Sequence, residues 1–434
     1  MLMIPTATPP LPPRKPPARG RGLVVLLAMV LMAVSPVAAD VTVTGYAAAG
    51  LHAVEGRTSW LGGGFGRLYP GTDDSESPTT DATAQAHLAV HWQGDGIWSA
   101  FLHGTARAEP SRLSGRAGGL IEAYIQAELI RRQSDRWRFR FGHFLLPTSR
   151  ENIDIGWSSP YTLSFSALNT WIGEEVRVTG ASSEYRLASG DLAEWSFGAS
   201  LFGGNDSNGT LLAWRGWTFG DRLTAFDETL PLPPLRVLRD GGAFEEQQAS
   251  GTLPFGSDLD GRAGFAAWLG WRHHDLGGIR LTHYDNRGDR ELYNGEYAWA
   301  TSFDLLGFDL HPGGGFSILG EVGRGESGMG DTVGKQVDID FDVAYLMASW
   351  FHRGFRTSVR FDTFENVDRD GTPGDDNSED GEAWTFALFW EGWQDFRLGV
   401  ELLDLDVQRP AARRYGSRTD PDGRSFKLEV RWYF

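Results

Sequence analysis

The chain has 434 residues, of which 41% are hydrophobic and 12% aromatic, with 56 glycines, no cysteine and a formal net charge of −17. The absence of cysteine excludes a disulfide scaffold and any metal or nucleophilic site built on a thiolate. The acidic balance argues against nucleic-acid binding, because neutralisation of phosphates supplies most of that affinity.

The first 39 residues have the pattern of a secretory signal. Basic residues between positions 14 and 21 precede an apolar run over 23–34, and small residues follow up to Ala39. The run is shorter than the roughly 20 residues that a membrane-spanning helix needs. The sequence therefore predicts a cleaved export signal at 1–39 and one mature domain at 40–434, located beyond the inner membrane.

Stretches of about ten residues with alternating apolar and polar side chains recur along the mature chain. Two examples are 337–351, where three aspartates alternate with Val337, Ile339 and Phe341, and 355–364. This alternation is typical of outer-membrane strands that turn apolar groups to lipid and polar groups to the lumen. Sixteen such stretches can be counted.

The connections between these stretches alternate in length. Long, polar, glycine-rich segments lie near 55–82, 109–119, 145–173, 204–260, 285–292, 325–336, 366–382 and 408–422. Short connections lie near 94–96, 133–135, 187–191, 273–277, 311–315, 352–354 and 391–395. A soluble sandwich has no reason to alternate in this way. We therefore predict an all-β fold, a transmembrane antiparallel β-barrel of sixteen strands with short periplasmic turns and long external loops.

Pairing across the first short turn predicts a register for that hairpin. We expect Trp92 opposite Trp98, which makes one face of the hairpin wholly apolar. The same register sets His87 opposite His103 on the lumen face. Two imidazoles are too few for a closed zinc shell, so we interpret them as wet lumen side chains.

The clearest candidate for function is an arginine column. Arg136, Arg138 and Arg140 alternate with three aromatic residues, and Glu128 on the preceding stretch falls opposite Arg138 or Arg140. If the aromatic residues face lipid, the guanidinium groups line the lumen about 6.6 Å apart. They would attract anions and orient permeating dipoles. In the alternative interpretation, lumen carboxylates neutralise the arginines, which then only hold the wall in shape.

Two segments resemble known outer-membrane families. Residues 138–153 resemble the strand-to-loop segment of the phosphate-selective porin superfamily, where a Gly-x-Phe-x-x-Pro run, here Gly142, Phe144 and Pro147, leaves the fifth strand. Residues 427–434 resemble the C-terminal signature of Gram-negative outer-membrane barrels, which close on phenylalanine. The lysine-rich phosphate site of those porins has no counterpart, because the mature chain has only two lysines.

The resemblance to porins also bears on the loop 145–173. In general porins the third loop folds into the barrel and narrows it, and we expect the same here, with an external cap or a subunit contact as the alternatives. An external loop so rich in aromatic residues must pack on something. The candidate pore-lining residues beyond the arginine column are Arg150, Glu151, Asp154, Arg177, Arg356 and Arg360.

Two further loops have less specific patterns. The segment 204–260 is too long for a simple connector, so we expect it to be structured, as a lid, a recognition surface, a latch between protomers or surface decoration. The acidic loop near 366–382 holds weak candidates for a hard-cation site, namely Asp368, Asp370, Asp375, Asp376 and Glu379. The alternative is a solvated loop, or one bridged loosely to lipopolysaccharide by divalent ions.

Together these features predict an outer-membrane porin that forms an aqueous channel for passive diffusion of small hydrophilic or ionic solutes. No cofactor and no enzymatic activity are expected. The expected partners are outer-membrane lipid, lipopolysaccharide and solutes, and family resemblance implies a homotrimer. One alternative is an outer-membrane barrel enzyme of the lipase or protease type, although no recognisable motif for it is present. Another is a plugged barrel dedicated to one ligand.

Overall fold

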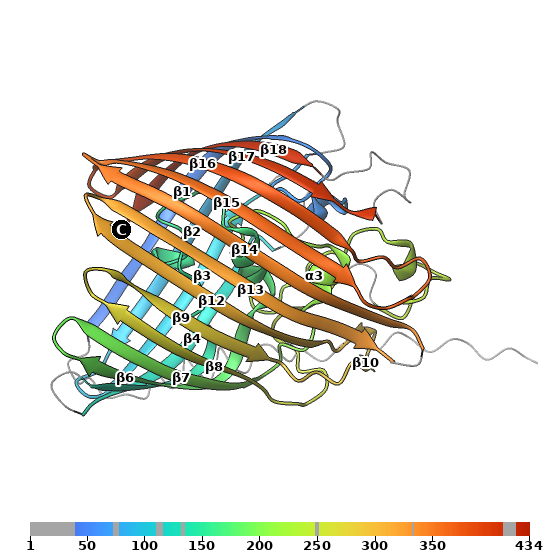
Figure 1. The fold of residues 1–434 in the computed structure, drawn as a ribbon, viewed down its shortest axis with the longest axis horizontal. Helices are drawn as coiled ribbons and strands as arrows, with labels where there is room; N and C mark the ends of the chain where they lie inside the picture. The colour runs from blue at the N-terminus through green and yellow to red at the C-terminus, as the bar shows by residue number, and fades with distance from the viewer. Residues whose placement is uncertain are drawn as a thin grey trace, which may run out of the picture. The chain divides into compact units, whose positions relative to one another are not determined.

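The computed structural model describes residues 40–72, 78–109, 116–131, 135–247, 251–331, 334–410 and 422–434. Sixteen strands of this described chain form a closed antiparallel barrel, in which successive strands are neighbours and the last pairs with the first (Figure 1). The predicted all-β fold and strand number are therefore confirmed. The predicted export signal lies outside the described residues.

The barrel strands are β1 (Asp40–Glu55), β2 (Thr79–Gln93), β3 (Trp98–Ala108), β4 (Gly118–Ile130), β5 (Arg136–Leu145), β6 (Arg177–Ser189), β7 (Ala193–Gly203), β8 (Gly264–His273), β9 (Gly277–Asp285), β12 (Ala300–Gly313), β13 (Phe316–Gly330), β14 (Gln336–His352), β15 (Phe355–Asp368), β16 (Glu379–Trp393), β17 (Phe396–Gln408) and β18 (Gly423–Tyr433). The connections contain η1 (Trp60–Gly62), η2 (Ile155–Trp157), α2 (Ala167–Glu175), α3 (Thr210–Trp214), η3 (Arg236–Leu238) and a hairpin of β10 (Leu292–Tyr293) and β11 (Glu296–Tyr297). None of the helices in the described ranges has the length and apolarity needed to cross a membrane.

Short and long connections alternate around the barrel, as predicted. The predicted register of the first hairpin is wrong by two residues, because Trp92 pairs with Ala100. The turn there spans four residues, 94–97, and the amide of Gly94 donates a hydrogen bond to the carbonyl of Trp98. Trp98 therefore belongs to the turn end of β3 and faces no partner on β2.

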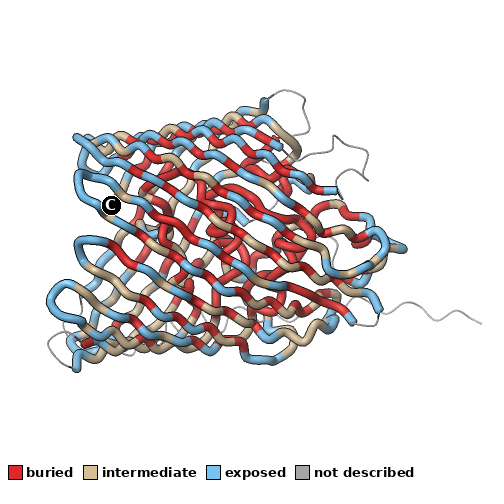
Figure 2. The backbone as a smooth tube through the Cα atoms, in the orientation of Figure 1, coloured by how far each residue is buried: buried red, intermediate tan, exposed pale blue. Residues whose placement is uncertain are grey.

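On the half of each strand next to the short turns, apolar side chains face outward and polar ones inward. In β18, Leu428, Val430 and Trp432 are exposed on the outer surface, whereas Glu429 and Arg431 are buried toward the interior. Figure 2 shows the alternation of exposed and buried positions along the wall. This half therefore has the apolar outer belt expected of a barrel in a membrane.

On the half next to the long loops, the polarity of β14 is reversed: its apolar side chains face inward and its acidic side chains face outward. Val337, Ile339 and Phe341 are buried in the interior core, while the alternating Asp338 and Asp340 point to the other face. The expectation that the apolar residues of this stretch face lipid is wrong, because protein rather than water fills the barrel at this level.

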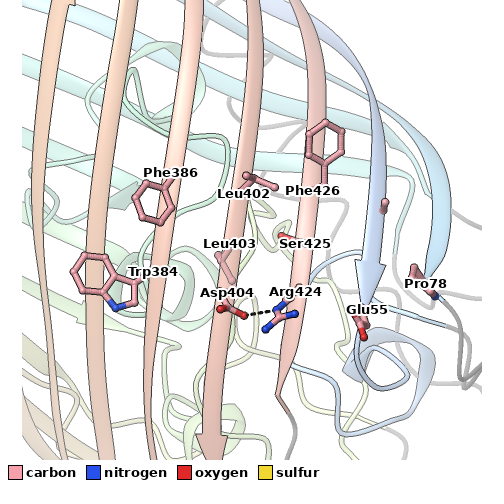
Figure 3. A pocket seen from close by; sticks show the side chains of 11 residues that line it. Glu55, Pro78, Trp384, Phe386, Leu402, Leu403, Asp404, Arg424, Ser425 and Phe426 are labelled. Carbon is pink, nitrogen blue, oxygen red and sulfur yellow. Dashed lines mark hydrogen bonds and ion pairs between the residues drawn. The ribbon is translucent and has the colours of Figure 1, made fainter.

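The outer surface between β16, β17, β18 and β1 shows the same change (Figure 3). Phe386, Leu402 and Phe426 line an apolar groove, and the next row toward the long loops carries Asp404 and Arg424, which form an ion pair of 2.8 Å. Charged groups are costly in hydrocarbon, so this row marks the edge of the apolar belt.

Three long connections, β1–β2, β5–β6 and β7–β8, fold into the loop half of the barrel, where Figure 1 shows them as coils behind the wall. Trp60, Trp171, Trp214 and Trp217 come from these connections and are 0–1% exposed. They belong to one core cluster with inward apolar residues of β12 to β17. The interior is therefore packed protein at the loop end.

Candidate functional site

The part of the lumen next to the short turns is open to water and charged. Arg136, Arg138 and Arg140 occupy alternate positions of β5, and the side chains of Arg136 and Arg138 remain 56% and 26% exposed. Glu128 of β4 lies opposite Arg138 in the register, and the two side chains form an ion pair of 2.9 Å. The first of the two predicted pairings of Glu128 is therefore confirmed.

Paired charges continue around this half of the barrel. Arg272 of β8 and Arg150 of the β5–β6 loop both contact Asp309 of β12, at 2.9 and 3.2 Å. Arg356 of β15 lies 3.4 Å from Glu391 of β16. Each of these three arginines thus faces a carboxylate, and the pair of Arg150 and Asp309 is covered by protein.

The β5–β6 connection, residues 146–176, crosses the lumen and is bonded to the opposite wall. The backbone amides of Leu163 and Ser164 donate hydrogen bonds to Glu401 of β17, and the carbonyl of Ser164 accepts one from Arg360 of β15. The side chain of Ser166 caps α2 by accepting a bond from a backbone amide of its first turn. These contacts confirm the prediction that this loop folds into the barrel.

Four of the predicted pore-lining residues are covered by protein instead of facing open water. Arg150, Glu151, Arg177 and Arg360 are each at most 6% exposed. These side chains are buried because the inward loop carries its backbone N–H and C=O groups out of water. The buried backbone groups need hydrogen-bond partners, and charged side chains provide them. Arg177, for example, donates hydrogen bonds to the carbonyls of Ile121, Gly173 and Thr224.

Two buried carboxyl groups of this loop lack a full ionic partner. Glu151 shares Arg360 with Asp362, and burial raises the pKa of Glu151 to about 8. Glu175, at the end of α2, accepts hydrogen bonds from the indole N–H of Trp171 and from the backbone amides of Gly209 and Leu211, but burial still raises its pKa to about 7. The charge of both groups therefore changes near neutral pH.

Glu379, a weak metal candidate, is used to hold the inward segments together. It accepts hydrogen bonds from Arg67, from Arg409 at 2.8 Å and from the backbone amide of Trp217 at 3.0 Å. Because its oxygens are taken and the side chain is 2% exposed, Glu379 is not available to a metal ion.

The other metal candidates are Asp368, Asp370, Asp375 and Asp376. In the structure, no three of these four carboxylates have their oxygens close enough together to hold one metal ion. Among the described residues, the acidic group whose ligand atoms all lie within 4.8 Å is Asp206, Asp258 and Asp260. Burial, together with the two neighbouring carboxylates, raises the pKa of Asp206 to about 7. Sequence reasoning missed this group because Asp206 lies about fifty residues before Asp258 and Asp260 in the chain.

A chain of polar side chains lies on β2, β3 and β4, beside residues 152–157 of the inward loop. The sequence predicted only part of it. His87 Nδ1 lies 3.0 Å from His103 Nε2, and His103 Nδ1 lies 3.7 Å from an oxygen of Glu122. The two imidazoles meet diagonally, because Ala89 rather than His87 is opposite His103. The sequence feature that could have indicated Glu122 is its spacing of six residues from Glu128, which places both carboxylates on one face of β4.

Comparison with known proteins finds no matching family model and no matching curated relative. Solved structures do match. OmpF of Salmonella typhi, in complex with daunomycin, has a TM-score of 0.53 at 11% identity, covering 91% of this chain and 97% of that chain. The outer membrane channel DcaP of Acinetobacter baumannii has a TM-score of 0.52 at 10% identity, with the same coverage. A loop-deletion mutant of OmpT, an outer membrane protein of Vibrio cholerae, has a TM-score of 0.51 at 11% identity, covering 92% and 100%.

These likenesses establish the class of fold, a closed sixteen-stranded barrel of the outer-membrane porin type. They do not single out the phosphate-selective porins. Within this fold, the candidate site is the lumen, which is charged and wet at one end and filled by inward connections at the other.

Proposed function

We propose that the protein is an outer-membrane channel through which small hydrophilic or ionic solutes diffuse. The observation that carries the proposal is the closed barrel whose outer belt is apolar while the lumen inside that belt is lined by exposed charged side chains. Lipid on one face and water on the other require this arrangement. Solutes would be sorted by the opposed charges at the narrowest level, not by covalent chemistry.

The residues that we propose for solute contact are those at the border of the wet region. Arg136, Arg138 and Arg140 form one wall with Glu128, and Asp154 of the inward loop is partly exposed. Arg356 adds a half-buried cation on the far side. Arg150, Glu151, Arg177 and Arg360 would act indirectly by holding the loop in place.

We further propose that residues 1–39 are removed on export, that the mature barrel lies in the outer membrane in contact with lipopolysaccharide, and that it assembles as a homotrimer. The apolar belt and the alternation of short and long connections support the location. Mass measurement of the mature chain tests the cleavage after Ala39, and the size of the detergent-solubilised barrel tests the trimer.

Reconstitution into a planar bilayer tests the channel directly. Stepwise conductance from the folded protein, with a reversal potential in a salt gradient, is the expected result. A folded and inserted barrel that shows no conductance steps under any voltage or pH would contradict diffusion through the lumen.

One observation favours a second candidate, a plugged barrel dedicated to one ligand. The three inward connections fill the loop half with an apolar core and buried ion pairs. This candidate predicts silence in the bilayer together with saturable binding of a solute. A barrel enzyme is the remaining alternative, and an assay of ester and peptide hydrolysis by the purified barrel tests it.

A further inference from the structure

A cavity of about 400 Å³ lies between the barrel wall and the inward loop. Its wall side is one row of neighbours in the register, Thr44, Ala89, His103 and Glu122, on β1 to β4. Its other side is residues 152–157 of the loop. The volume lies in the range of small-molecule sites, which begins at roughly 300 Å³.

The charged side chains that line this cavity are carboxylates. Glu122 lies on the wall, with one oxygen accepting a hydrogen bond from the amide of Leu145 and the other 3.7 Å from His103 Nδ1. That second distance is too long for a hydrogen bond, so the oxygen can accept another donor. Asp154 lies on the loop side and is oriented by the hydroxyl of Tyr433 at 3.0 Å. No lining residue is an arginine or a lysine.

Asn152 provides a second and independent sign of a ligand. It lines the cavity and is 4% exposed, yet neither its amide nitrogen nor its amide oxygen has a hydrogen-bond partner within the described part of the chain. A buried amide without hydrogen-bond partners destabilises the fold, because the desolvation of its polar atoms is not compensated. A bound solute with both a donor and an acceptor, or water, would satisfy it.

Aromatic faces complete the cavity. Phe101 lines the wall side, and Trp157 lines the loop side. Trp157 has a φ of 55° and follows Gly156 with a φ of 69°, so the chain passes through two left-handed residues. A left-handed tryptophan is strained, and such strain persists where the surroundings hold it. Here Gly156 packs against the side chain of His87, where an added Cβ would lie 2.9 Å from the Cβ and Cγ atoms of His87.

We propose that this cavity is a binding site for a small organic ammonium, with Glu122 and Asp154 as counter-ions and the rings of Phe101 and Trp157 beside the cation. An ammonium group donates three hydrogen bonds and is attracted to aromatic faces, which matches acceptors on both walls of the cavity. The proposal deepens the channel function, since it assigns a class of solute to one place along the lumen.

Equilibrium binding to the folded barrel in lipid nanodiscs tests the site. Benzylammonium is titrated by calorimetry, with benzyl alcohol and benzoate as the neutral and anionic comparators and empty nanodiscs as the blank. We expect saturable binding of benzylammonium alone. Glu122→Gln and Asp154→Asn should each weaken it at least tenfold, while each retains the oxygen that accepts the backbone hydrogen bond.

Glu194→Gln is the matched control. Glu194 is a carboxylate on the inward face of β7, half-buried near Arg186 and outside the cavity, so binding should be unchanged. Equal affinity of the wild-type chain, Glu122→Gln and Asp154→Asn would overturn the proposal, as would equal binding of benzyl alcohol or no saturable binding at all. If one variant does not fold, the other decides. A barrel that conducts without binding refutes this site alone, whereas one that binds without conducting refutes the channel alone.

Discussion

The two halves of the barrel wall are built from the same strands and have opposite polarity. On β17 next to the short turn, Leu398 and Leu402 face outward and Glu401 faces inward. Next to the long loop, Asp404 faces outward and Leu405 is buried inside. The short-turn half therefore has the apolar exterior and polar interior of a membrane barrel, and the loop half has a polar exterior around an apolar core.

The difference shows that alternation along a strand does not by itself tell which face points inward. That depends on whether lipid, water or protein lies on each side of the wall. Hydrocarbon outside requires apolar groups there and leaves the lumen polar. Between the apolar belt and the long loops, the outer surface of the wall is polar. The inner face there is apolar, and the inward connections pack against it. Carboxylates at the level of Asp404 are consistent with this boundary, because a charge in hydrocarbon is expensive.

The largest expected effect comes from the core of the loop half. Trp217→Ala should lower the free energy of unfolding by about 3–5 kcal/mol, because the side chain is fully buried among aromatic rings. Urea unfolding in lipid vesicles measures the loss. Trp195→Ala, on the outer surface and 38% exposed, is the control. If both variants lost the same free energy of unfolding, the claim that the loop half contains the packed core would be contradicted.

A charge placed on the outer face locates the edge of the belt. Val400 lies between Leu388 and Leu428 on the outer wall, so Val400→Arg should cost about 2–4 kcal/mol of folding free energy in a bilayer. Asp406→Arg, above the belt, should cost less than about 1 kcal/mol. The same vesicle assay reads both. A similar cost at the two positions would move the membrane boundary away from Asp404.

The wet half should control ion selectivity. Arg138→Glu reverses the charge of an inward side chain that faces the lumen, so we expect the permeability ratio to shift toward cations by up to about tenfold. Arg324→Glu, on a side chain that is 79% exposed, should leave the ratio unchanged. Reversal potentials in a salt gradient measure both. The same ratio for Arg138→Glu and the wild-type chain would assign Arg138 to wall structure alone.

The smallest effect concerns pH and the inward loop. The pKa of Glu175 is raised in the folded state, so burial of the loop is most favourable below its ordinary range and weakens as pH rises through about 7. After correction for the intrinsic exchange rate, the protection of residues 167–175 should therefore fall as pH rises to about 7 and then level off. Glu175→Gln should remove most of this fall in protection, since an amide does not ionise. An unchanged profile in that variant would place the titrating group elsewhere, with Glu151 as the next candidate.

Several features of the fold and of the site could be predicted from the chain alone. Alternation and the spacing of glycine-rich segments located the sixteen strands, and the even spacing of Glu128, Arg138 and Arg140 placed them on one face. The register at Trp92 could not be predicted, because a slip of two residues leaves every side chain on the same face, so alternation does not distinguish the expected connection at 94–96 from the turn at 94–97 that is present. The two side chains of His87 and His103 are nevertheless in contact, because diagonal neighbours on one face of a sheet also lie within reach of each other.

Local order along the chain thus determined the strands, their number and which residues share a face, since a period of two is a property of the extended backbone. The tertiary structure alone decided which face of β14 points inward and which of the predicted arginines meets water. It also decided that Glu122 and Asp154 border one cavity. These outcomes depend on where the long connections pack, and the energy of that packing comes from residues far apart in the sequence.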